Sequence, residues 1–181
     1  MAEHMPRDIW FVSDTHFGHG AVIAFGKRPF ADANEMDAAM AERWRARVKD
    51  TDLVFHLGDV AWTRAGLRLF ASLPGTKRLI LGNHDARETT AHVQRLYLFR
   101  RFTDDGFIAS HMPMMMERGR EPINVHGHVH AVDVAFPGYV NISVEKTDYA
   151  PLHLDELRLR VKAERARLDA FVAENDLAAD A

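Results

Sequence analysis

The chain has 181 residues, of which 47% are hydrophobic, and this length and composition suit a single globular domain over residues 1–181. The absence of cysteine excludes iron–sulfur clusters and thiolate zinc sites and agrees with a cytoplasmic protein. The net charge is −3 and the basic residues form only short doublets, so we expect no extended nucleic-acid surface. The sequence has no run of about 18 apolar residues and no leader pattern at residues 1–5, so we expect neither a membrane span nor export.

Short apolar runs, rich in β-branched and aromatic residues, recur along the chain and predict strands. The runs are Ile9 to Val12, Leu53 to Phe55, Leu79 to Leu81, Phe107 to Ala109, Ile123 to Val125 and Tyr139 to Val144. The intervals between the early strands have helical patterns, whereas the later half is richer in strands. This alternation indicates an α/β protein.

Three helices are predicted between the early strands. The first has Asn34 as its N-cap and an apolar face that begins at Met36. The second runs from about Thr63 to Leu73 and stops at Pro74, because proline and the glycine after it do not continue a helix. The third is expected around residues 88–98.

A last amphipathic helix is predicted over about residues 155–175. One apolar stripe runs through this highly charged segment, formed by Leu157, Val161, Leu168, Phe171 and Val172. We expect the first part of the stripe to pack on its own domain. The later part is expected to make a homodimer contact, because the helix extends beyond what a body of this size can cover.

Polar clusters follow five of the predicted strands, at the point where each strand ends. They are Asp14-Thr15-His16, Gly58-Asp59, Gly82-Asn83-His84-Asp85, Ser110-His111 and Gly127-His128-Val129-His130. Open sheets place their sites at strand ends, so we expect the clusters to meet. The glycines before Asp59, Asn83 and His128 are expected to allow sharp turns that bring the next side chain to the site.

The side chains in these clusters are typical metal ligands. The candidates are Asp14, His16, Asp59, Asn83, His111, His128 and His130. Carboxylates, imidazoles and an asparagine carbonyl suit manganese, iron, cobalt, nickel or zinc better than calcium, which prefers six or more oxygens. The set is too large for one ion, whereas two ions bridged by one carboxylate would use all of it. The methionines after His111, at positions 112 and 114–116, are expected to line a loop or a pocket wall.

The five clusters, taken in order over residues 8 to about 145, resemble the motif series of the calcineurin-like metallophosphoesterases. The opening Ser13 to His19 and the later Arg28-Pro29-Phe30 are similar to small stand-alone bacterial and phage members. Val60 to Arg64 stand where the phosphoprotein phosphatase branch has Asp-Arg-Gly, which argues against protein dephosphorylation. The resemblance implies an α/β fold with a two-sheet β-sandwich flanked by helices.

The resemblance also implies a binuclear metal centre. One ion would be held by Asp14, His16, Asp59 and His130, and the second by Asp59, Asn83, His111 and His128. Asp59 would then bridge the ions, which would hold the phosphoryl group and a shared hydroxide for in-line attack. Mn²⁺ is the expected ion, with iron, nickel, cobalt and zinc as alternatives.

His84 resembles a family histidine that is not a ligand, hydrogen-bonds the phosphoryl group and protonates the leaving group. Asp85 is expected to orient its imidazole. Two residues are weaker candidates for substrate contact, since His19 could instead support a ligand and Arg28 could be a solvated loop cation.

The remaining histidines match no position of the motif series. We expect packing at a strand end for His126 and structural or exposed positions for His56, His92 and His153.

These observations predict a metal-dependent phosphoesterase for a small phosphodiester or phosphomonoester. Two dications outweigh the ligand carboxylates and a hydroxide, so the centre would attract an anion despite the net charge of −3. One alternative is a nuclease for short or single-stranded nucleic acid. Another is an inactive interaction scaffold of the same fold, which the complete set of ligand positions and His84 disfavours.

Overall fold

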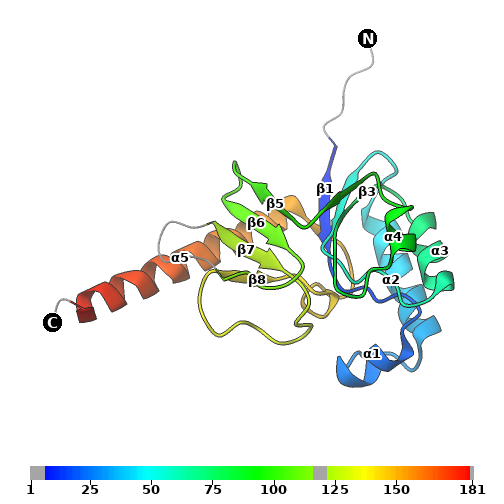
Figure 1. The fold of residues 1–181 in the computed structure, drawn as a ribbon, viewed down its shortest axis with the longest axis horizontal. Coiled ribbons are helices and arrows are strands. Elements are labelled where there is room, and N and C mark those ends of the chain that lie inside the picture. Colours follow the sequence, from blue (N-terminus) through cyan, green and yellow to red (C-terminus); the bar gives the residue numbers. More distant parts are fainter. Residues whose placement is uncertain (1–6, 116–121, 180–181) are drawn as a thin grey trace, which may run out of the picture.

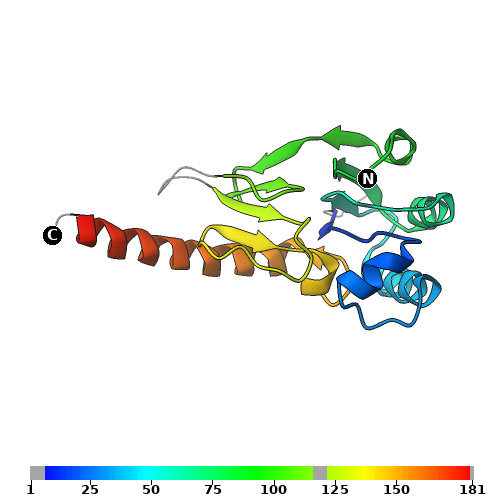
Figure 2. The ribbon, with the colours of Figure 1, turned by 60° about the horizontal axis from the view of Figure 1, so that its bottom comes forward.

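Two β-sheets pack face to face, with helices on the outside (Figure 1 and Figure 2). The computed structural model describes residues 7–115 and 122–179. The start of the chain, where no leader is expected, and Met116 of the methionine run lie outside the described residues. The arrangement is the predicted α/β two-sheet fold.

The first sheet has five strands in the order β4-β3-β2-β1-β9. Four of them are parallel, and β9 pairs antiparallel with β1. Their bounds are β1 Ile9–Val12, β2 Leu53–His56, β3 Thr76–Ile80, β4 Arg95–Tyr97 and β9 Leu152–His153. Because β1, β2 and β3 run in the same direction, the loops that follow them lie at one edge of the sheet.

The second sheet has four strands in the order β5-β6-β7-β8. Strands β6, β7 and β8 are parallel, and β5 is antiparallel to β6. Their bounds are β5 Phe99–Phe102, β6 Phe107–Ser110, β7 Ile123–His126 and β8 Tyr139–Asn141. The chain passes from one sheet to the other at Leu98, between β4 and β5.

Alternation along the strands of the first sheet separates two hydrophobic cores. Val54 and its neighbours on one face pack against helices α2 (Ala33–Arg47) and α3 (Arg64–Ser72). Phe11 and its neighbours on the other face pack against the second sheet. Both faces are therefore buried, which explains the nearly continuous apolar runs of these strands.

The long helix α5 (Leu154–Ala179) begins beside β9 and packs along β7 and β8. Leu157 and Val161 are buried in the core between the sheets, whereas Phe171 is 37% exposed. Beyond the body of the protein, α5 projects alone (Figure 1 and Figure 2). None of the helices in the described part of the chain has the length and apolar character needed to cross a bilayer.

Backbone pairing joins the two sheets near the ends of β1 and β8. Ser13 forms an isolated parallel bridge with Ser143, and the Val144 amide donates to the Ser13 carbonyl at 3.1 Å. On its other side the same loop is bonded to the loop after β2, through Asp14 N to Gly58 O at 3.0 Å. The loop after β1 is thus held from both sheets.

Three local predictions were wrong. The N-cap of α2 is Asp32, whose carboxylate accepts from the amides of residues 34 and 35, two positions before the expected cap. The helix expected over 88–98 is only the short α4 (Arg87–Thr90), because the free edge of β3 pairs with residues 95–97 as a strand. The strand expected over 139–144 ends at Asn141, and residues 144–146 form a 3₁₀ turn.

Candidate metal centre

The predicted ligands come from the loops at the carboxyl ends of parallel strands in both sheets. The loops after β1, β2 and β3 supply Asp14, His16, Asp59 and Asn83, and those after β6 and β7 supply His111, His128 and His130. The structure groups six of the seven residues in two clusters, in each of which one ligand atom per residue lies within 4.8 Å of the others.

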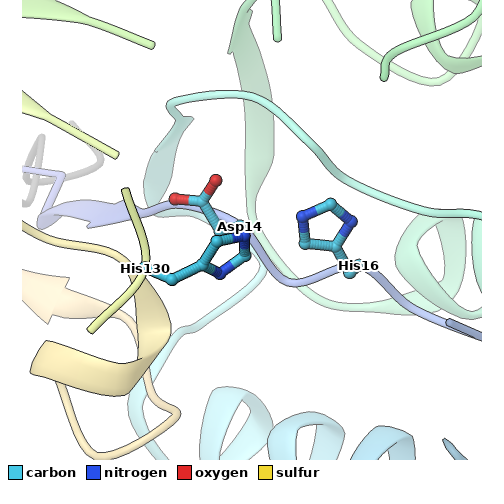
Figure 3. Close-up of side chains that lie close together, drawn as sticks. All are labelled: Asp14, His16 and His130. Atoms are coloured by element: carbon cyan, nitrogen blue, oxygen red, sulfur yellow. The ribbon is translucent and has the colours of Figure 1, made fainter. Parts of the chain in front are cut away.

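The first cluster consists of Asp14, His16 and His130 (Figure 3). His16 is only 2% exposed, and neither of its ring nitrogens has a hydrogen-bond partner among the described residues. Burial lowers the pKa of His16 to about 2, so the ring is neutral and carries a free lone pair. Buried imidazole nitrogens are costly without a partner, and a metal ion is a suitable one.

The second cluster consists of Asp59, His111 and His128. His111 Nδ1 lies 2.8 Å from the Leu57 carbonyl oxygen, an acceptor, so Nδ1 carries the proton and Nε2 a lone pair. Yet the Asn83 Oδ1 atom lies 2.9 Å from that same Nε2, and the His128 Nδ1 atom lies 3.2 Å from it. A cation would satisfy all of these converging lone pairs, so the donor set fits a metal ion.

Asp59 belongs to the second cluster and also faces the first. Its Oδ2 atom is 3.5 Å from His16 Nε2, and its Oδ1 atom is 3.6 Å from His111 Nε2. The carboxylate is buried, and Oδ1 also accepts from the His84 amide at 2.9 Å. Each oxygen therefore faces one cluster, as a bridging ligand requires.

Most of the predicted ligands have a left-handed backbone, which is uncommon outside glycine. The φ angles are 58° at Asp14, 48° at His16, 58° at Asp59, 69° at His128 and 52° at His130. Such conformations cost about 1–3 kcal/mol each and persist where the surrounding fold enforces them, often at functional sites. For Asp14, His16 and Asp59, the backbone bonds between the loops after β1 and β2 supply that enforcement.

The glycines that precede three of the ligands do not all act as expected. Of these three glycines, only Gly58 has a positive φ, at 98°. A Cβ there would lie 2.6 Å from His111 Nδ1. At Gly82 a Cβ would overlap Asp59, and at Gly127 it would overlap Ser13 and Asp14. The second and third glycines therefore permit close approach between loops and not a special turn.

Glu145, just after β8, belongs to the site although its sequence position gave little sign of it. Its Oε1 atom lies 2.9 Å from His130 Nδ1 and 2.8 Å from Arg28 Nη2. Burial alone would lower the pKa of His130, but the hydrogen bond and charge of Glu145 raise it above its ordinary value. A carboxylate on Nδ1 fixes the ring so that Nε2 is free to bind a metal. The only sequence signal was an acidic residue at the end of one more strand.

Arg28 does not occupy the position that a substrate contact requires. Its side chain is fully buried, pairs with Glu145 and donates to the carbonyls of Asp14 and Thr15 at 2.7 and 3.1 Å. It therefore holds the ligand loop in place and is neither a substrate contact nor a solvated loop cation.

His84 is exposed, and its ring centroid lies 5.8 Å from that of His16. No described residue hydrogen-bonds its ring, so the expected orientation by Asp85 was wrong. Asp85 instead accepts from the amides of Asp59, Val60 and Gly82 at 2.8–3.0 Å, because the turn after β3 folds its carboxylate onto these donors. Burial raises the pKa of Asp85 despite these bonds.

The other histidines of the described residues lie outside the two clusters. His19 stacks on Trp62, with 4.0 Å between the ring centroids. As predicted, His126 is buried at the end of β7 beside Tyr139, and His56 is buried against the Thr15 hydroxyl. His92 is exposed, and His153 packs on Trp10.

A comparison with known families identifies the chain. The profile of the calcineurin-like phosphoesterases matches residues 7–172. The chain belongs to this family. The predicted resemblance is therefore confirmed, and with it metal-dependent hydrolysis of phosphate esters as the general activity of the family.

The relatives support membership without defining a substrate. An uncharacterized protein of Methanocaldococcus jannaschii, MJ1445, is 30% identical over 161 residues, which cover 82% of this chain and 88% of the relative. The gene 66 protein of Mycobacterium phage D29 is 43% identical over 83 residues, 43% of this chain and 40% of the phage protein. The crystal structure of AQ665 from Aquifex aeolicus, a protein of unknown function, shares the fold with a TM-score of 0.68 at 24% identity, over 84% of this chain and 98% of AQ665.

Proposed function

We propose that the protein is a binuclear metal-dependent phosphoesterase for a small phosphate ester. The observation that carries the proposal is the position of Asp59, whose two oxygens face two separate clusters at 3.5 and 3.6 Å. The first ion would be bound by Asp14, His16, Asp59 and His130, and the second by Asp59, Asn83, His111 and His128. When bound, the ions would supply the positive charge that holds the phosphoryl oxygens and activates water.

The protein itself would position the ligands and move a proton. Glu145 orients His130, and the carbonyl of Leu57 orients His111. His84 is the proposed donor of the proton to the leaving group, because its ring is exposed beside the first cluster and free of other bonds in the described residues. Its place is set by the backbone bond to Asp59 and not by Asp85.

Mn²⁺ is the proposed ion, because the site mixes imidazoles with carboxylates and one amide oxygen. The proposal includes a homodimer through the outer part of α5. That part projects from the body and carries the partly exposed Phe171. A cytoplasmic location also remains part of the proposal.

Metal removal tests the function. Protein dialysed against a chelator should lose hydrolysis of p-nitrophenyl phosphate esters, and Mn²⁺ should restore turnover better than Ca²⁺. Elemental analysis of the restored protein should find two ions per chain. A D133N variant is a suitable control, since Asp133 is exposed and, among the described residues, its ion pair is with Lys146, outside both clusters. Full turnover in excess chelator would refute the mechanism.

A further inference from the structure

Two exposed aromatic side chains, Trp62 and Phe25, lie beside the first cluster. Trp62 is 52% exposed, and its ring stacks on His19 with 4.0 Å between centroids and 6° between planes. The Trp62 ring also lies 5.1 Å from the His84 ring. Phe25 is 59% exposed, and its ring lies 5.4 Å from the ring of His130. Exposed aromatic side chains grouped beside a candidate active site indicate a binding surface.

A pocket adjoins the second cluster. Its volume is about 280 Å³, and its lining includes Asn83, Leu98, His111, Met112 and Met114. Asn83 and His111 connect this pocket to the metal site. Leu98 is 74% exposed and Met112 is 46% exposed, so the pocket presents apolar surface to a ligand. The prediction that methionines line a pocket wall is thus confirmed for Met112 and Met114.

The metal site therefore adjoins two surfaces suited to binding an organic group, one beside each cluster. Trp62 and His19 flank the cluster that contains His16, and Leu98 and the methionines flank the cluster that contains His111. A phosphomonoester has one organic group and would leave one surface empty. Its second negative charge would also need an additional cation, yet Arg28 is buried against Glu145 and, within residues 7–115 and 122–179, no lysine or arginine lines the pocket.

We propose that the substrate is a phosphodiester whose leaving group is a planar aromatic group stacked on Trp62. This inference rests on the proposed function. The second ester group would occupy the pocket beside Leu98 and Met112. Water adds to phosphorus, the P–O bond to the group on Trp62 breaks, and the oxygen of that group takes a proton from His84. The products are the released alcohol or phenol and a phosphomonoester, while the proton lost by water goes to solvent and solvent returns one to His84.

Trp62 is assigned to the leaving group because its ring lies beside that of His84. A stacked ring also has a low cost of ordering, since His19 already holds it in place. Stacking of a planar group on an aromatic side chain changes affinity by about 1–3 kcal/mol, so loss of the ring should weaken binding about tenfold.

The first experiment compares esters with a common leaving group. We expect kcat/KM with Mn²⁺ to decrease from phenyl p-nitrophenyl phosphate through methyl p-nitrophenyl phosphate to p-nitrophenyl phosphate. A preference for the monoester would overturn the inference while leaving the phosphoesterase function intact. Failure to hydrolyse any of the three with Mn²⁺ would instead contradict the proposed function itself.

The second experiment measures binding. Calorimetric titration of the Mn²⁺-loaded protein should give tighter binding for diphenyl phosphate than for dimethyl phosphate. Trp62→Leu should weaken diphenyl phosphate about tenfold and leave dimethyl phosphate unchanged, whereas Trp62→Phe, which keeps a ring, should restore most of the difference. Phe136→Leu is the matched control, because Phe136 is 67% exposed and lies against α5. Equal losses for both ligands in Trp62→Leu would overturn the assignment.

Discussion

Glu145→Gln should destabilise the protein far more than a matched change at the surface. The variant keeps the size of the side chain but removes the charge opposite Arg28, whose side chain is 0% exposed and lies 2.8 Å from a carboxylate that is 4% exposed. Removing one partner of a buried ion pair costs about 3–5 kcal/mol. We expect about 3 kcal/mol, because the glutamine carbonyl can still accept one hydrogen bond.

The control is Asp148→Asn. Asp148 also pairs with an arginine, Arg43, at 3.2 Å, but the side chains are 38% and 81% exposed. Solvent screens such a pair, so the expected loss is about 0–1 kcal/mol. The two variants remove the same kind of charge and differ mainly in burial.

The assay is urea unfolding of the metal-free proteins, followed by circular dichroism, so that metal binding does not contribute to the free energy of unfolding. A titration with Mn²⁺ gives a second readout. Loss of the carboxylate on His130 should weaken one of the two ions about 10–100-fold. Equal losses of stability in both variants, or an unchanged Mn²⁺ affinity, would refute the role assigned to Glu145.

Four other predictions test separate parts of the molecule. Asp59→Asn should lower the metal content from two ions per chain, because it weakens both sites at once; retention of two ions by elemental analysis would exclude the bridge. His84→Ala should keep both ions and lower kcat roughly 10²–10⁴-fold on an alkyl ester but less on a nitrophenyl ester, and equal losses would leave His84 as a contact to the phosphoryl oxygens only. Burial lowers the pKa of His56 to about 3, so the unfolded chain takes up the proton first and stability falls as pH drops from about 6.5 towards 3. Between pH 6 and 4, His56→Phe should reduce that slope by roughly 1.4 kcal/mol per pH unit, and an unchanged slope would contradict a neutral buried ring. Phe171→Glu should reduce the mass measured by light scattering if α5 mediates a dimer, and a wild-type monomer would end that proposal.

Six of the nine strands in the described residues were predictable, namely β1, β2, β3, β6, β7 and β8, whereas β4, β5 and β9 were not. Each apolar run is short, and those that feed the site stop at a polar cluster, so the periodicity and the ligand types pointed to the same edge of the fold. The helix expected over 88–98 failed for a tertiary reason. Leu96 and Tyr97 pair with Leu79 and Ile80 of β3, a partner that no local pattern over that stretch reveals.

The ligand positions were predictable from the sequence, whereas the residues that hold the ligands in place were not. Asp14 and His16 lie in one short motif, whereas Arg28 reaches Glu145 across 117 positions of sequence. That contact exists only because β8 ends beside β7 and brings Glu145 next to His130. Asp85 shows the opposite error, since adjacency in sequence suggested a partner for His84 while the turn directed the carboxylate to backbone amides.

The bridge between Ser13 and Ser143 has a consequence for the kinetics of metal exchange. Asp14 and His16 lie on a segment that is bonded to the loop after β2 on one side and to the segment after β8 on the other. Moving these ligands apart would break backbone bonds from both sheets at once, which is an opening of core structure and not a loop fluctuation. Bound ions should therefore leave slowly, at a rate set by partial unfolding of the sandwich. The amide hydrogens of this loop should exchange with solvent as slowly as those of the central strands.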